Sequence, residues 1–282
     1  MAALSNIKRR IRSVGSTRQI TKAMQLVAAS KLRRAADTAL GPQAYTAALR
    51  EVLAGVATAA NVGAHPLYRR SQGGSRLAIV IAGDRGLAGA YNSNVLRLLA
   101  GYVKRPGGPV QAIAIGRYAG RHLARLSRVA EIAAYPLDNG EAAASLVKPV
   151  LAEATRLFES GQVDQVDVLY TKFVSTVRQE PAMLQLLPVA APEAGRPAGE
   201  LEPDSDALLE YATRRLLEAN LMQTILEARA AEQAARMLAM LNASDNAQSL
   251  IDDLTLSYNN ARQAGITQEI AEISGGSEAM QS

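Results

Sequence analysis

The chain of 282 residues contains no cysteine and no tryptophan, and its only histidines are His65 and His122. The lack of cysteine excludes disulfides, a thiolate nucleophile and zinc–cysteine sites. Two histidines are too few for a multi-histidine metal cluster and argue against a Ser–His–Asp triad. Aromatic residues make up 4% of the chain, too few for platforms that stack single-stranded nucleic acid. No run approaches 18 uncharged apolar residues, so we expect no membrane-spanning helix.

Proline is absent from both ends of the chain, because all 11 prolines lie between Pro42 and Pro203. A proline inside a helix costs about 3 kcal/mol, so these ends predict two long helices that flank a compact domain. Residues 205–274 contain a single glycine, Gly265, and are rich in good helix formers. A helical segment of this length without an internal repeat predicts a coiled coil.

Apolar residues recur at helical spacing in both terminal segments. The N-terminal residues are Leu4, Ile7, Ile11 and Val14, followed by Ile20, Met24, Val27 and Leu32. The jump after Val14 places apolar residues on more than one face, which predicts a helix covered by protein on several sides. The predicted C-terminal seam consists of Leu216, Ala219, Leu226, Ala230, Met237, Leu241, Ile251 and Tyr258.

The two ends carry opposite charge. Residues 1–36 contain no acid and nine basic residues, which are Lys8, Arg9, Arg10, Arg12, Arg18, Lys22, Lys31, Arg33 and Arg34. Residues 205–282 contain 11 acids and five arginines. Such complementarity favours antiparallel pairing of the two helices. A solvated basic face and a nucleic-acid-binding patch are the alternatives for the basic segment, but its apolar stripe favours burial against protein.

The middle of the chain predicts alternating strands and helices. The expected strands are residues 76–82, 110–115, 166–173 and 183–189, and the expected helices are 92–103, 117–126 and 141–159. This order predicts a mostly parallel sheet covered on both faces. The fold class is therefore α/β, with a Rossmann-like domain and a long antiparallel coiled coil of the terminal helices. The predicted boundaries are 1–62 and 205–282 for the coiled-coil shaft, 75–190 for the α/β domain and 191–204 for a loop.

A glycine-rich turn, Gly83–Gly89 (GDRGLAG), follows the first expected strand. A turn of this kind between a strand and a helix can hold a phosphate at the helix N-terminus. The spacing is G-x-x-G-x-x-G, however, whereas the dinucleotide fingerprint requires G-x-G-x-x-G. A tight turn that uses glycine at positive φ is the alternative. No catalytic constellation, metal site or cofactor site emerges from the residues.

Three segments resemble the gamma subunit of F-type ATP synthases. They are IKRRIRSVGSTRQITKAMQLVAASKLRRA at the start, GDRGLAGAYNSN after the first strand and RMLAMLNASDNAQSLIDDLTLSYNNARQAGITQEIAEISGG near the end. This chain has Gly83 where the family usually has serine, and Gly275-Gly276 where it usually has Gly-Ala. The cysteine insertion and transit peptide of chloroplast members are absent, so we expect a bacterial origin.

The resemblance implies a rotor without catalytic, cofactor or metal sites of its own. Its terminal helices would form a coiled coil inside a ring of three alpha and three beta subunits, and its α/β domain would contact the epsilon subunit and the membrane c-ring. Proton flow would turn this shaft and drive ATP synthesis at the beta subunits. The resemblance implies no nucleic-acid partner. It implies a peripheral location on the cytoplasmic side of the bacterial inner membrane, reached through the complex.

The resemblance also implies which residues contact other subunits. Thr21, Lys22 and Met24 would face an acidic lever of the beta subunit, and Arg236 would occupy a polar contact position. Four further residues would touch the loops that catch the upper shaft: Arg262, Gln263, Thr267 and Glu269. Plain core packing is the alternative for Met24, and a solvated helix position is the alternative for Arg262.

Overall fold

The computed structural model describes residues 2–69, 74–137, 142–191 and 204–279. Its elements are α1 (Ala2–Val56), η1 (Val62–Ala64), η2 (Pro66–Tyr68), β1 (Arg76–Ile81), α2 (Tyr91–Val103), β2 (Val110–Ile115), α3 (Arg117–Leu123), β3 (Val129–Tyr135), α4 (Ala142–Glu159), β4 (Gln165–Phe173), β5 (Gln179–Leu187) and α5 (Ser205–Ala279). The chain divides into two compact units. The first unit is Met1–Val27 with Met237–Ser282, and the second unit is Ala28–Arg236.

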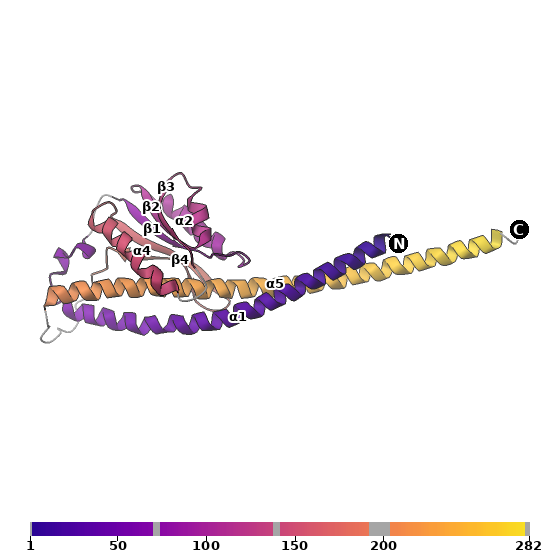
Figure 1. Ribbon diagram of the computed structural model, residues 1–282, viewed down its shortest axis with the longest axis horizontal. Helices are drawn as coiled ribbons and strands as arrows, with labels where there is room; N and C mark the ends of the chain where they lie inside the picture. The colour runs from indigo at the N-terminus through magenta and orange to yellow at the C-terminus, as the bar shows by residue number, and fades with distance from the viewer. Residues whose placement is uncertain (1, 70–73, 138–141, 192–203, 280–282) are drawn as a thin grey trace. The chain divides into compact units, whose positions relative to one another are not determined.

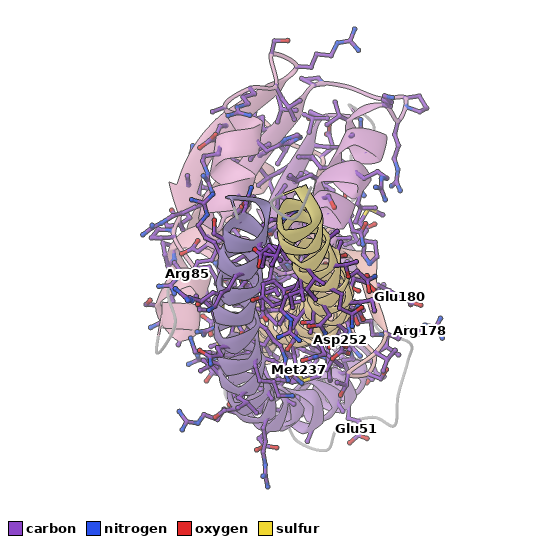
Figure 2. The ribbon with its side chains drawn as sticks, turned by 90° about the vertical axis from the view of Figure 1, so that its right-hand side faces the viewer. Glu51, Arg85, Arg178, Glu180, Met237 and Asp252 are labelled. Atoms are coloured by element: carbon purple, nitrogen blue, oxygen red, sulfur yellow. The ribbon has the colours of Figure 1, made fainter. Side chains whose placement is uncertain are left out.

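The second unit is built on a five-stranded sheet of order β3-β2-β1-β4-β5. All neighbouring strands are parallel except the pair β4 and β5. Every residue of β1 is buried, as expected for a parallel strand covered on both faces. The edge strand β5 begins with an exposed ion pair between Arg178 and Glu180 (Figure 2), and charges of this kind discourage edge-to-edge association.

Helices cover both faces of the sheet, so the predicted fold class is confirmed (Figure 1). Alternate residues of β1 point to opposite faces. Leu77, Ile79 and Ile81 join the core cluster that contains α4 and α5 side chains. Ala78 and Val80 join the cluster formed with α2 and α3. Helix α5 is therefore both a layer of the α/β domain and one helix of the terminal pair.

The terminal helices α1 and α5 pair antiparallel within each unit. In the second unit, Leu53 near the end of α1 shares a cluster with Leu209 near the start of α5. Ala39, which precedes Leu53 in α1, shares a cluster with Leu226, which follows Leu209 in α5. In the first unit, α1 begins and α5 ends at the same end (Figure 1).

The seam of the first unit adds residues to the predicted one. In α5, buried or half-buried residues recur at alternating spacings of four and three: Met240, Ser244, Ala247, Ile251, Leu254 and Tyr258. This is the heptad pattern of a coiled coil, and the predicted Met237 and Leu241 are half-buried beside it. In α1, Ile20 and Val27, which were predicted to lie on a further face, are exposed, while the neighbouring Thr21 and Ala28, the first residue of the second unit, are buried. Small side chains therefore occupy seam positions where the sequence offered larger apolar ones next to them.

One element departs from the sequence prediction. Strand β3 was not predicted, and only Val129 of its seven residues is buried. Helix α1 continues through Pro42 and ends at Val56. The first residue of the predicted helix 141–159 and nearly all of the predicted loop 191–204 lie outside the described residues.

Candidate functional site

The glycine-rich turn after β1 carries its own anion. Asp84 Oδ1 accepts hydrogen bonds from the Arg117 N–H at 2.7 Å and from the Leu137 N–H at 3.1 Å. Arg117 is the first residue of α3, so the carboxylate lies at the helix N-terminus that follows β2. A phosphate held by the turn itself would lie at the N-terminus of α2, and within this turn the Gly83 N–H is already bonded to Asn92 Oδ1 at 2.8 Å. The positive φ of Gly89 fits the tight-turn alternative.

Helix α5 occupies the place where a doubly wound fold binds its ligand. That place is the crevice at the carboxyl ends of the strands where the strand order reverses, which in this sheet lies at β1 and β4. There Ala88 and Tyr91 pack against Ala231 of α5, with Phe173 and Ala235 at the margin. The chain itself thus occupies the part of the crevice next to Ala88 and Tyr91.

The phenol of Tyr91 fixes this contact with a hydrogen bond. Its hydroxyl donates to the Ala228 carbonyl of α5 at 3.1 Å. Burial, assisted by the nearby Glu232 carboxylate, raises the pKa of Tyr91 well above its ordinary value. The phenol therefore keeps the proton that this hydrogen bond needs.

Arg236, predicted to contact another subunit, is engaged within the chain. It forms an ion pair with Glu232, in which Nη2 lies 2.5 Å from Oε1 and the side chains are only 12% and 10% exposed. The same Nη2 lies 3.5 Å from the Gly86 carbonyl. The buried partner Glu232 was missed by the sequence analysis, although an acid four residues before an arginine on a helix is a recognised pairing signal. A contact of Arg236 with another subunit stays a prediction.

The three predicted contact residues of α1 differ in exposure. Thr21 is buried in the seam, and its hydroxyl donates to the Arg18 carbonyl at 3.0 Å. Lys22 is exposed, and Met24 is half-buried. Lys22 is therefore free to meet an acidic partner, whereas Thr21 supports the helix pair.

The four predicted contact residues near the end of α5 are all exposed; they are Arg262, Gln263, Thr267 and Glu269. Three large apolar residues on this stretch are exposed as well, Ile266 at 48%, Ile270 at 59% and Ile273 at 73%. Their spacing of four and three places them on one helix face. An apolar face left uncovered on a helix marks an interaction surface.

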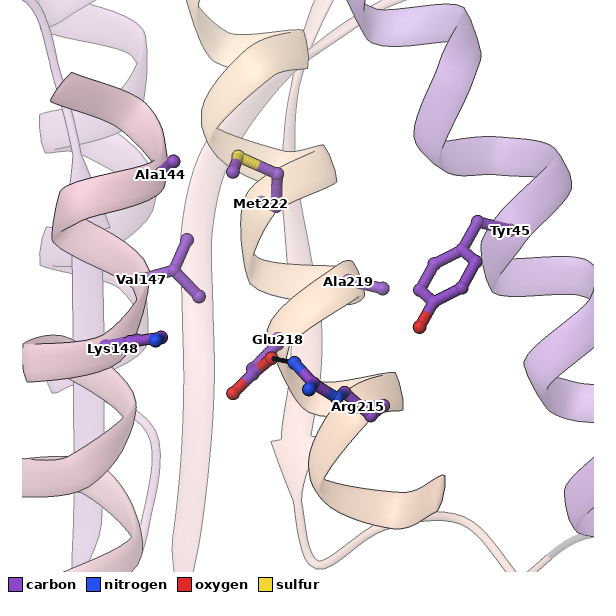
Figure 3. Close-up of a pocket in the computed structure, with 8 residues that line it drawn as sticks. All are labelled: Tyr45, Ala144, Val147, Lys148, Arg215, Glu218, Ala219 and Met222. Carbon is purple, nitrogen blue, oxygen red and sulfur yellow. Dashed lines mark hydrogen bonds and ion pairs between the residues drawn. The ribbon is translucent and has the colours of Figure 1, made fainter. Parts of the chain in front are cut away.

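A groove of the second unit has a volume of about 460 Å³ and lies between α1, α4 and α5. Val147 of α4 and Tyr45 of α1 point toward α5 from opposite sides, and Arg215 pairs with Glu218 at one end (Figure 3). Its lining contains no nucleophile paired with a base. Among the described residues, no group of three or more His, Cys, Asp or Glu is placed to hold a metal. No described helix is both long and apolar enough to cross a membrane.

Comparisons with known proteins identify the family. A family model described as ATP synthase matches residues 3–280. The ATP synthase gamma chain of Heliobacterium modesticaldum is 37% identical over 99% of this chain and 100% of its own length. That of Symbiobacterium thermophilum is 40% identical over 98% of this chain and 97% of its own length.

Solved structures show the same fold. A chain in the cryo-EM structure of the Euglena gracilis mitochondrial ATP synthase OSCP/F1/c-ring has a TM-score of 0.71 at 18% identity, covering 99% of this chain and 95% of that one. A chain of the central stalk and c-ring of the Tetrahymena thermophila mitochondrial enzyme has a TM-score of 0.59 at 22% identity, covering 80% of this chain and 99% of that one. On the combined evidence of sequence and fold, the chain belongs to the ATP synthase gamma chain family.

Proposed function

We propose that this chain is the central-stalk rotor of an F-type, proton-translocating ATP synthase. It turns inside a ring of three alpha and three beta subunits and couples proton flow to ATP synthesis or hydrolysis at the beta subunits. The observation that carries the proposal is the continuity of α5, a single helix from Ser205 to Ala279 whose first part is a layer of the α/β domain. Torque applied to the α/β domain is therefore transmitted to the shaft along one continuous helix.

The partners follow from the two parts of the molecule. Residues 1–62 and 205–282 form the shaft, and residues 75–190 form the domain that meets the epsilon subunit and the c-ring. The first unit exposes the apolar residues Ile20, Leu26, Val27, Leu250 and Leu256, which a surrounding protein ring would cover. The chain would be held peripherally at the cytoplasmic side of the bacterial inner membrane by these partners.

The contact residues would act on the beta subunits in two places. Lys22 and Met24 meet the acidic lever, where the positive charge of Lys22 complements it. Arg262, Gln263, Thr267 and Glu269 meet the loops that catch the upper shaft. Substrate nucleotides bind to the partners, so this chain supplies geometry and torque only.

Co-purification tests the proposal. An affinity-tagged chain, expressed in its native cell, should retain two different nucleotide-binding subunits in stoichiometric amounts and support ATP-driven proton pumping in membrane vesicles. Recovery of the chain alone, or with nucleic acid in a salt-dependent manner, would contradict the assignment.

A further inference from the structure

Helix α5 presents a smooth face to the α/β domain at the end of the second unit. There the Ala228 carbonyl accepts the hydrogen bond of Tyr91, and Ala231 packs with Ala88 and Tyr91, with Ala235 at the margin. Alanines let backbones approach closely, but they carry no protruding side chain that would resist rotation of the helix about its own axis. Arg236 is the last residue of α5 that belongs to this unit.

One charged pair interrupts the smooth face. The Glu232 carboxylate lies behind Gly83, where a Cβ at that glycine would come within 2.9 Å of Oε1. The guanidinium of Arg236 pairs with the same carboxylate oxygen and reaches toward the Gly86 carbonyl. The pair therefore lies against two backbone positions of the same turn.

The turn itself is fixed to the sheet. The Gly83 N–H donates to Asn92 Oδ1 of α2 at 2.8 Å. A Cβ at Gly86 would lie 2.7 Å from the Tyr118 hydroxyl of α3, and Asp84 is bonded to the first residue of α3. Movement of Glu232 around the α5 axis would consequently meet a turn that α2 and α3 hold in place.

We propose that the Glu232–Arg236 pair and the turn Gly83–Gly89 form a torsional lock, which fixes α5 against the sheet at the point where α5 leaves the second unit. This inference rests on the proposed rotor function and names the residues that pass torque within it. Without the lock, α5 would be free to twist from about Ala228 instead of Arg236. A longer unsupported segment of α5 twists more under the same torque. A larger part of each rotational step is then absorbed as elastic twist of the helix.

The test uses the whole ATP synthase in inverted membrane vesicles and compares Glu232→Gln with Glu218→Gln. Both changes remove the acid of a paired arginine on α5, but the side chains of the Arg215–Glu218 pair are far more exposed, at 43% and 34%. Glu232→Gln should leave ATP hydrolysis by the detached F1 part within about twofold of wild type and lower the number of protons pumped per ATP. It should also raise amide exchange of residues 83–90 and 228–236 by roughly tenfold or more, as expected when a largely buried charge loses its partner.

A second variant changes the turn Gly83–Gly89 instead of the charged pair. Gly83→Val adds a branched apolar side chain whose Cβ comes within 2.9 Å of Glu232 Oε1, so it should reproduce the loss of pumping without any change of charge. If either variant assembles and pumps as many protons per ATP as Glu218→Gln, the lock is refuted. If the complex with the wild-type chain does not pump at all, the proposed rotor function fails instead, whatever the variants do.

Discussion

The Tyr102 hydroxyl of α2 donates a 2.7 Å hydrogen bond to Oδ2 of Asp167 in β4, and both side chains are buried. The Arg76 guanidinium lies over the Tyr102 ring at 4.8 Å from its centroid. Burial raises the pKa of Asp167, while the hydrogen bond from Tyr102 opposes that rise. The hydrogen bond from the Tyr102 hydroxyl therefore partly replaces the hydration that the Asp167 carboxylate loses on burial.

Tyr102→Phe should destabilise the second unit by about 1–3 kcal/mol, because it removes the hydroxyl donor of a buried carboxylate and leaves Gln165 to donate to it. The free energy of unfolding from denaturant titration measures the effect. Tyr45→Phe is the control, since Tyr45 is exposed and its loss should cost less than about 0.5 kcal/mol. Equal effects at the two positions would show that the buried hydrogen bond contributes nothing.

His65 should make the segment after α1 sensitive to acid. Its Nδ1 accepts a hydrogen bond from the Leu67 N–H at 3.2 Å. Burial lowers the pKa of His65 below 6.5, against the raising effect of Glu210. The unfolded chain then binds the proton more tightly than the folded one, so stability is lost as pH falls through 6.5 toward the lower folded pKa.

The loss should amount to less than about 1 kcal/mol, because solvent reaches much of the ring. Exchange of the Leu67 amide, corrected for its intrinsic rate, should accelerate between about pH 7.5 and about pH 5.5. His65→Asn keeps a side-chain acceptor that does not titrate in this range, so its corrected exchange should stay flat. An identical acceleration in His65→Asn would assign the effect to another group.

Cysteines at Ile11 and Leu254 should form a disulfide within one chain on mild oxidation. Both residues lie at seam positions of the first unit, whose two helices run antiparallel. The chain has no native cysteine to interfere. The pair Ile11 and Ala212 should stay reduced, because Ala212 packs with Leu53 near the other end of α1. Electrophoretic mobility without reductant reports both results, and a cross-link only in the second pair would refute the antiparallel register.

Met24→Lys should uncouple the assembled enzyme. The added charge would lie beside the acidic lever and favour one rotational state, with a coupling of about 1 kcal/mol or more where solvent is excluded. ATP hydrolysis should continue, while proton pumping per ATP falls and the apparent activation energy rises.

Met24→Leu, which is similar in volume and uncharged, should stay near wild type. Hydrolysis and pumping are measured together on both variants. Should Met24→Lys pump as efficiently as it hydrolyses, Met24 is ordinary helix packing and does not touch the lever.

Much of the fold can be predicted from local patterns in the sequence. The apolar run of β1 is buried in full, and the proline-free C-terminal segment forms one helix. Patterns of this kind depend only on residues that are close together in the sequence, so they can be recognised without a structure. Strand β3 escaped the prediction because it is an edge strand, and only its pairing with β2 reveals it.

The choice of seam residues is the first feature that required the tertiary structure. Ile20 and Thr21 are adjacent, and hydrophobicity favours the isoleucine, yet Thr21 is the buried one. The facing helix decides which side of α1 is covered, and its position is not encoded in the local period.

The candidate sites divide in the same way. The sequence alone determined the family, the two helical ends and the mostly parallel sheet, and it predicted contact residues near the end of α5. Only the tertiary structure decided that α5 packs into the crevice of the sheet and that Glu232 lies against Gly83. These residues are far apart along the chain, and a contact between distant segments exists only after the sheet and helices have packed.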